Sequence, residues 1–195
     1  MTLPLVLDLC AGTGSATEPL VSLGFSRVCV DIVSQVTKKN RLRTTIVQTD
    51  VREFEWQGPP VGIVWASPPC TEFSRTLMPW CEFREPSMEL VHACLRVIER
   101  VNPAVWCLEN VRGAARWIEP LLGKPRQIVS GRWYLWGNFE PLNVYLPRSS
   151  HTKERRSSAN KRERSRIPQP IAQAFADSAA RSLRQLSLPF EGIER

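Results

Sequence analysis

The stretch VGIVWASPPC, residues 61–70, decides the fold of this chain. Its first six residues are apolar and partly β-branched, which is typical of a buried strand in a parallel sheet. Pro68 and Pro69 then end the strand and fix the backbone, leaving Cys70 at the carboxyl end. Because ligands bind at that edge of open α/β sheets, the stretch predicts a thiol in a ligand-binding crevice.

A second apolar run, residues 104–108, leads into Glu109, Asn110 and Val111. The run reads as a second strand, so Glu109 is expected to project from a strand end into the same crevice as Cys70. Between the two strands, apolar residues at helical spacing predict a core-facing helix over residues 88–101.

The amino-terminal third predicts two βα units and the start of a third. Strands are expected over residues 3–9, 27–30 and 46–48, and a helix over residues 17–23. Gly12 and Gly14 form a turn after the first strand, where a ligand can lie against the backbone. Asp31 ends the second strand, where a ribose diol can be bound, and Asp50 follows the third, where it can accept from an adenine amino group.

These motifs resemble the cytosine-C5 DNA methyltransferase family, whose Pro-Cys and Glu-Asn-Val motifs match residues 69–70 and 109–111. The resemblance covers nearly the whole chain. It implies a doubly wound α/β, Rossmann-like class I methyltransferase fold with a mostly parallel sheet of about seven strands. It also implies methylation of cytosine C5 in DNA, with Cys70 as the nucleophile at C6, Glu109 as the partner of N3 and Asn110 orienting the Pro-Cys loop.

The same resemblance implies S-adenosyl-L-methionine as the cofactor. The stretch from residue 8 to residue 14 looks like the family's first motif, although Cys10 stands where an aromatic residue is usual. Ile32 likewise stands where an aromatic residue that stacks on adenine is common. The cofactor-binding residues that the resemblance implies are Asp8, Cys10, Ala11, Gly12, Thr13, Gly14, Asp31, Ile32, Asp50, Val51 and Pro68.

Further motifs are expected on both sides of this core. Ser74 and Arg75 follow the Pro-Cys motif as DNA contacts, and residues 75–87 are expected either to close over a flipped base or to pack Trp80 on the body. An aromatic stretch, residues 130–139, predicts a late strand. It holds Arg132, our candidate for a family arginine at the cytosine, with Arg112 and Arg126 as alternatives. Residues 167–172 look like the family's last motif, before a helix to about residue 186 that returns near the first strand and the cofactor.

The net charge of +7 is concentrated between residues 148 and 166, where eight lysines and arginines oppose two glutamates. This segment has almost no large apolar residue, so a mobile loop is expected over residues 146–166. It either contacts a phosphate backbone or is simply solvated. The cations assigned to nucleic acid are Arg155, Arg156, Lys161, Arg162 and Arg164. Relatives that methylate defined sites carry a large target-recognition region in this place, so target choice here is expected to be relaxed, short, supplied by a partner protein, or not a DNA sequence at all.

The composition limits which classes of protein this chain can belong to. A chain of 195 residues with 43% hydrophobic and 23% charged residues is expected to form a single catalytic domain, residues 1–195. Six cysteines without a C-x-x-C pair argue against a zinc site and indicate a reducing, cytoplasmic compartment. Neither a signal peptide nor a membrane-spanning run is expected.

Three alternatives stay open at this point. A C5 methyltransferase acting on tRNA or on free cytidine nucleotides would explain the missing recognition region. An exocyclic-amino DNA methyltransferase would carry an aromatic residue in place of Cys70. A non-catalytic relative would bind nucleic acid through the basic loop alone.

Overall fold

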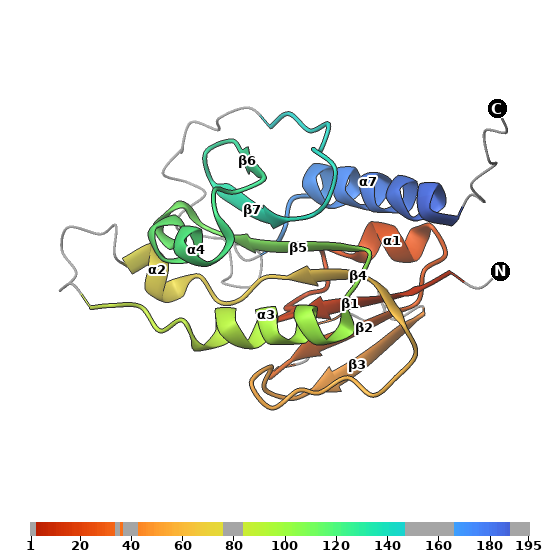
Figure 1. Ribbon diagram of the computed structural model, residues 1–195, viewed down its shortest axis with the longest axis horizontal. Coiled ribbons are helices and arrows are strands. Elements are labelled where there is room, and N and C mark those ends of the chain that lie inside the picture. The colour runs from red at the N-terminus through yellow and green to blue at the C-terminus, as the bar shows by residue number, and fades with distance from the viewer. Residues whose placement is uncertain (1–2, 34–35, 37–42, 76–83, 147–165, 188–195) are drawn as a thin grey trace, which may run out of the picture.

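The computed structural model describes residues 3–33, 36, 43–75, 84–146 and 166–187, which form a seven-stranded sheet in the order β3-β2-β1-β4-β5-β7-β6 (Figure 1). The strands are β1 (Leu5–Leu9), β2 (Arg27–Asp31), β3 (Thr44–Gln48), β4 (Val61–Ala66), β5 (Val105–Asn110), β6 (Gln127–Val129) and β7 (Trp133–Gly137). Neighbouring strands are parallel, except that β7 is antiparallel to both β5 and β6. The predicted doubly wound, mostly parallel sheet is therefore confirmed.

Helices cover both faces of the sheet. They are α1 (Glu18–Ser22), α2 (Thr71–Arg75), α3 (Glu89–Val101), the short 3-10 helix η2 (Arg112–Ala114), α4 (Ala115–Leu122) and α7 (Gln169–Ser187). Figure 1 shows α1 and α7 side by side on one face and α3 on the other. Each face has its own apolar core, because side chains alternate between the two faces along each strand.

The local sequence explains the central elements. All six residues of β4 are buried, as its continuous apolar run predicts. Helix α3 buries Val91, Cys94 and Val97 at helical spacing, and it ends at Asn102, whose φ of 43° places it in the left-handed region. Its His92 is exposed, as expected for a surface position.

The carboxyl-terminal helix α7 returns across the sheet. Phe175 packs edge-on against Trp65 of β4, with ring centroids 4.8 Å apart, and against Phe139 at 6.0 Å. Just before the helix, the Ile167 N–H donates to the Ser15 hydroxyl at 3.0 Å, beside the glycine turn. The chain therefore brings its last helix back to the first motif.

One element differs from its sequence prediction. The aromatic stretch 130–139 is not one strand, because Ser130 and Gly131 take φ values of 53° and 67° and reverse the chain between β6 and β7. Two successive positive φ values are typical of a type I′ hairpin turn. Strand β7 starts only at Trp133, and the short strand β6 before the turn was not anticipated.

The topology places a reversal of strand order at the centre of the sheet. The chain proceeds outward from β1 to β3 and then crosses back to β4, which pairs with β1 so that Leu9 lies beside Ala66. This reversal is the switch point at which open α/β sheets bind ligands.

Candidate active site

Cys70 lies just beyond the carboxyl end of β4. The turn that carries it is tied to β1, because the Ser67 N–H donates to the Leu9 carbonyl at 3.0 Å. Pro68 is buried, whereas Cys70 is exposed and begins the first turn of α2. Desolvation and then the Glu109 charge raise the pKa of the Cys70 thiol, and a hydrogen bond with Ser74 partly opposes the shift. Ser74, which was assigned to nucleic acid, thus lies against the candidate nucleophile.

Glu109 lies on β5, the strand next to β4. Because Ala66 pairs with Leu108, the Glu109 position is level with Ser67. Burial raises the pKa of Glu109 to about 7, although a hydrogen bond with Ser67 lowers it in part. The Ser67 hydroxyl also accepts from the Trp65 indole nitrogen at 2.7 Å. Ser67 and Trp65 are therefore supports of the carboxyl that sequence analysis missed.

Asn110 is fully buried behind these groups. Its side-chain nitrogen donates to the Pro68 carbonyl at 3.0 Å, and its oxygen accepts from the Val111 N–H at 2.9 Å. Both ends of the amide are thus used to hold the Pro-Cys turn of β4 against β5.

The three candidate arginines lie in different places. Arg132 is exposed at the start of β7, with its guanidinium 6.0 Å from the ring centre of Trp133. Antiparallel pairing puts that end of β7 beside the carboxyl end of β5, so Arg132 lies at the edge that carries Glu109. Arg112 is exposed in η2 after β5. Arg126 lies at the opposite end of β6 and donates to the Phe139 carbonyl at 3.2 Å.

The glycine turn after β1 lies beside Asp31. The Gly12 N–H donates to one Asp31 carboxylate oxygen at 2.8 Å, and the Val33 N–H donates to the other at 3.0 Å. Gly12 has a φ of 52°, and a Cβ there would meet no atom within 4 Å, so the space over the turn is open. Ile32 is 63% exposed next to Asp31. An open turn, a carboxylate and an exposed apolar side chain together fit a nucleoside.

The remaining residues of the turn face the protein. Thr13 is buried, and Ala11 is half-buried with its N–H donating to the Val30 carbonyl at 3.1 Å. The Cys10 sulfur lies 3.9 Å from that of Cys94 on α3, so this side chain points toward the core. Where the family usually has an aromatic side chain, only the backbone of this turn is left to face a cofactor.

A buried polar cluster supports the turn from beneath. Asp8 is 1% exposed and accepts from the Thr17 hydroxyl at 2.6 Å. The Arg27 guanidinium, also 1% exposed, donates to the Gly14 carbonyl at 2.6 Å and to Thr17 at 2.9 Å. Desolvation raises the pKa of Asp8 to about 7, against the effects of Thr17 and Arg27. Within the described ranges, the second Asp8 oxygen has no hydrogen-bond partner, so it is free to receive one.

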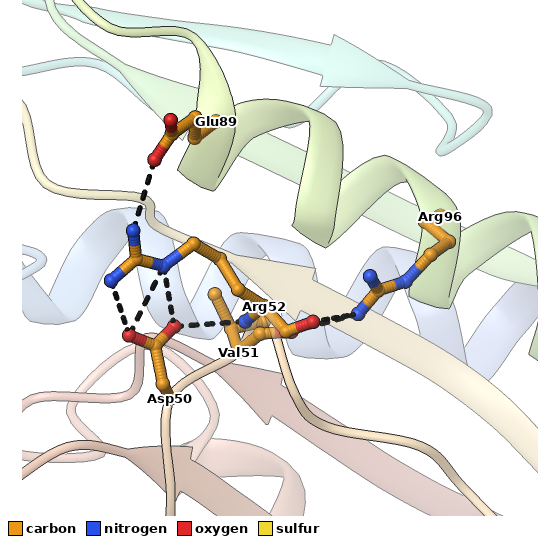
Figure 2. A network of polar contacts seen from close by, with 5 residues as sticks. All are labelled: Asp50, Val51, Arg52, Glu89 and Arg96. Carbon is orange, nitrogen blue, oxygen red and sulfur yellow. Dashed lines mark hydrogen bonds and ion pairs between the residues drawn. The ribbon is translucent and has the colours of Figure 1, made fainter.

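Asp50 belongs to a surface network (Figure 2). Arg52 donates to both Asp50 oxygens at 2.7–3.1 Å and bridges to Glu89 at the start of α3, 2.9 Å away. Arg96 donates to the backbone carbonyls of Val51 and Arg52 at 3.1 and 2.8 Å. The Val51 side chain is buried in the core, so only its backbone can contact a cofactor. The hydrogen bonds from Arg52 lower the pKa of Asp50.

The residues assigned to nucleic acid lie mostly outside the described ranges. Arg75 is exposed at the end of α2, but the following loop with Trp80 lies outside the described residues. So do the five cations assigned to the phosphate backbone: Arg155, Arg156, Lys161, Arg162 and Arg164.

Two kinds of feature are absent from the part of the chain that the structure describes. No helix there has both the length and the apolar character needed to cross a membrane. No group of histidine, cysteine, aspartate or glutamate side chains in those ranges is arranged to hold a metal ion.

Comparisons with known proteins agree with this architecture. Among solved structures, the chain is similar to an Escherichia coli protein described as a DNA modification methyltransferase encoded within a prophage. The sequence identity is 17%, the TM-score is 0.50, and the match covers 69% of this chain and 46% of that one. A TehB-like SAM-dependent methyltransferase from Corynebacterium glutamicum matches at 14% identity and a TM-score of 0.43, over 58% of each chain. The chain thus spans about half the length of these proteins.

Among curated proteins, no sequence matches this chain. The protein family described as C-5 cytosine-specific DNA methylase, in contrast, matches residues 5–116, more than half of the sequence. This region runs from β1 into α4 and includes the glycine turn, Cys70 and Glu109. The chain therefore belongs to the family of C-5 cytosine-specific DNA methylases.

Proposed function

We propose that this chain transfers a methyl group from S-adenosyl-L-methionine to C5 of cytosine in DNA, through a covalent bond between Cys70 and C6 of the base. The observation that carries the proposal is the placement of Cys70 and Glu109 at neighbouring strand ends. They are close enough for the Glu109 charge to raise the pKa of the thiol. Membership of the family supports the same chemistry.

Cys70 supplies the nucleophile. C5 of cytosine is a poor nucleophile until a group adds at C6, and a thiolate does so reversibly, leaving C5 with the character of an enamine carbon. After methylation, a base removes the C5 proton and the Cys70–C6 bond breaks, returning the thiolate. The exposed position of Cys70 lets a base extruded from its stack reach the sulfur.

Glu109 supplies the proton at N3. With a pKa of about 7, the carboxyl is largely protonated below neutral pH and can hold a hydrogen on the ring nitrogen as charge develops there. The Trp65 indole has only a hydrogen to give, so it occupies an acceptor position of Ser67. Ser67 is thus left to donate its own hydrogen to Glu109 and hold the carboxyl in place.

The two groups are coupled electrostatically. An ionised Glu109 raises the pKa of Cys70, so protonation of Glu109 removes a charge that opposes the thiolate. Because the pKa of Glu109 is about 7 and that of Cys70 is raised above its ordinary value, the carboxyl ionises before the thiol, and a neutral carboxyl paired with an ionised thiol is the minor combination in the free protein. It is nevertheless the combination that attack on C6 requires.

The cofactor half fits S-adenosyl-L-methionine. Asp31 would hold the ribose, and Ile32 would pack on the adenine. Asp50 would accept a hydrogen bond from the adenine amino group. The open turn at Gly12 would face the methionine chain of the cofactor. When bound, the cofactor supplies an electrophilic methyl group on a sulfonium sulfur.

We also propose that residues 1–195 act as one catalytic domain. The basic segment at residues 146–166 would take the place of a target-recognition region. Membership of the family supports DNA as the substrate, and target choice would then be relaxed or supplied by a partner protein.

Covalent trapping tests the proposed chemistry. A DNA oligonucleotide with 5-fluorocytosine is incubated with the protein and S-adenosyl-L-methionine, because a fluorine at C5 cannot be removed as a proton. We expect a denaturation-resistant adduct that requires the cofactor and is absent in Cys70→Ser. The same base in RNA tests the RNA alternative. Absence of adduct on DNA, RNA and free nucleotide alike would leave a non-catalytic binding protein.

A further inference from the structure

The outer edge of the sheet carries a groove beside β6. Residues 142–146 run along this edge strand, and a space of about 400 Å³ lies between the two segments. We call it the β6 groove. It is lined by Ile128, Val129, Ser130, Val144, Tyr145 and Leu146.

Tyr145 is held out in solvent by anchored neighbours. Val144 and Leu146 pack against the core, so the alternation of side chains turns the residue between them outward, where it is 86% exposed. The Gln127 side chain makes two hydrogen bonds with the Leu142 backbone, at 2.9 and 2.6 Å, and the Ser130 hydroxyl donates to the Leu146 carbonyl. The exposure of the ring is therefore imposed by a fixed backbone.

The groove adjoins the catalytic edge. Ile128 and Asn110 both pair with Tyr134, from opposite sides of β7. Neighbouring strands lie about 4.8 Å apart, so the Ile128 backbone lies about 10 Å from that of Asn110. Past the turn, Arg132 stands over Trp133 at the same end of the sheet. An exposed phenol ring, a groove and a cation thus lie beside the strand end that carries Glu109.

This combination suits an unpaired nucleobase. Proteins that bind single strands combine positive charge with aromatic side chains on which bases stack. Arg132 supplies positive charge at this end of the sheet, and the sequence carries a net charge of +6 over residues 148–166, which begin three positions after Tyr145. In a duplex the faces of the bases are already stacked on each other, so an exposed ring can stack only on an unpaired one.

We propose that the β6 groove holds an unpaired nucleobase next to the target cytosine, stacked on Tyr145, so that the protein prefers single-stranded over duplex substrate. The choice of nucleic acid as the occupant rests on the proposed function. The base stack and the strand preference go beyond it.

Binding by the full chain tests this inference. Fluorescence anisotropy is measured with a labelled single-stranded oligonucleotide and with the same sequence as a duplex. Tyr145→Ala is expected to weaken single-strand binding by roughly 5- to 150-fold, the usual cost of losing one base stack, and to leave duplex binding little changed. Tyr145→Phe keeps the ring and should bind like the unmodified protein. Leu23→Ala removes another exposed apolar side chain (42% exposed), at the end of α1, and should have no effect.

The salt dependence separates the ring from the charges. Loss of Tyr145 leaves the phosphate contacts in place, so the slope of log affinity against log salt should stay the same. Replacing the five cations assigned to the phosphate backbone by serine should instead reduce the slope, by about 0.7 for each single-strand phosphate that is no longer neutralised.

Three results would overturn the inference: equal binding of single strand and duplex by the unmodified protein, unchanged single-strand affinity in Tyr145→Ala, or a loss in Tyr145→Phe as large as in Tyr145→Ala. Trapping on 5-fluorocytosine is read separately. If the covalent adduct forms but Tyr145→Ala does not change single-strand affinity, only the proposed base stack is contradicted. If single-strand binding depends on Tyr145 but no adduct forms, only the proposed methylation is contradicted.

Discussion

The candidate site has a base half, with Cys70, Glu109 and Asn110, and a cofactor half, with Asp31 and Asp50. The two halves are built in physically different ways. In the base half, Glu109 is half-buried and Asn110 is fully buried on β5, and their supporting contacts come from within the protein. In the cofactor half, Asp31 and Asp50 reach solvent at the ends of β2 and β3, held by backbone N–H groups and by Arg52.

This difference determines which solution conditions each half responds to. Desolvation moves the pKa of Glu109 to about 7, so the base half should respond to pH in the physiological range. The Asp50–Arg52–Glu89 network is exposed, and such ion pairs weaken as salt screens them. The pH response of catalysis and the salt response of cofactor binding should therefore be separable by mutation.

The largest effect is expected at Cys70. Cys70→Ser should abolish methyl transfer and trapping, because an alcohol is a far weaker nucleophile than a thiolate. Cofactor affinity by titration calorimetry should stay within a few fold, because the residue belongs to the base half. Retained turnover in the serine variant would remove Cys70 from the mechanism and undo the division into two halves.

Glu109→Gln should lower turnover by about 10²- to 10⁴-fold, the usual contribution of a positioned acid. In the unmodified protein, the protonated carboxyl is lost as the pH rises through about 7 while the thiolate fraction still increases, so kcat/KM should rise with pH up to about 7 and then level off. The glutamine variant should lack this break at about pH 7 in a plot of log kcat/KM against pH. A break that persists in Glu109→Gln would assign the titration to another group, such as Asp8.

The same substitution should affect stability in a pH-dependent way. Because the folded-state pKa of Glu109 is raised above its unfolded value, the folded protein binds the proton more tightly, and stability falls between about pH 4.5 and 7. Glu109→Gln removes this loss, so its free energy of unfolding relative to the unmodified protein should rise with pH, by up to about 3 kcal/mol. Urea unfolding at pH 5 and pH 8 measures the difference. A constant gap between the two proteins would contradict the buried, shifted carboxyl.

The sequence predicted the fold well, and the reasons are local. Strand β4 begins and ends at the predicted residues because a continuous apolar run is bounded by prolines on both sides. Helix α3 was predicted over residues 88–101 from its apolar spacing, and it forms over Glu89–Val101. The hairpin at Ser130 and Gly131 was missed, because a serine in the left-handed region leaves no strong mark in an aromatic stretch.

The supports of the site were not predictable in the same way. Ser67 contacts Glu109 only because β4 and β5 pair in one register, and Arg27 reaches Gly14 and Thr17 only through the folded turn. One signal was present for Arg27, which is a charged residue opening an otherwise apolar strand. Contacts between residues far apart in sequence depend on register and packing, which no local pattern specifies.

In the cofactor half, Asp31→Ala should weaken S-adenosyl-L-methionine binding by roughly 1–3 kcal/mol, because it removes a charged acceptor and frees the Gly12 N–H. Asp31→Asn keeps one acceptor oxygen in place and should lose less. Titration calorimetry measures both, and the unfolding of the ligand-free proteins checks that the turn is intact. Equal affinity in the alanine variant would contradict the ribose assignment.

The smallest effect is expected at Arg52, whose guanidinium fixes the orientation of Asp50 from an exposed position. Arg52→Ala should weaken cofactor binding by less than Asp31→Ala does. In about 1 M salt, where charges are screened within about 3 Å, the Arg52→Ala variant should bind the cofactor as tightly as the unmodified protein. Arg100→Ala breaks an ion pair of the same kind, with Glu55 at 2.7 Å, and should leave cofactor affinity unchanged. Because Arg52 occupies both oxygens of Asp50, tighter binding in Arg52→Ala would mean that it competes with the adenine amino group for the carboxylate. Arg52 would then oppose cofactor binding, and the surface network would serve only to join the β3 end to α3.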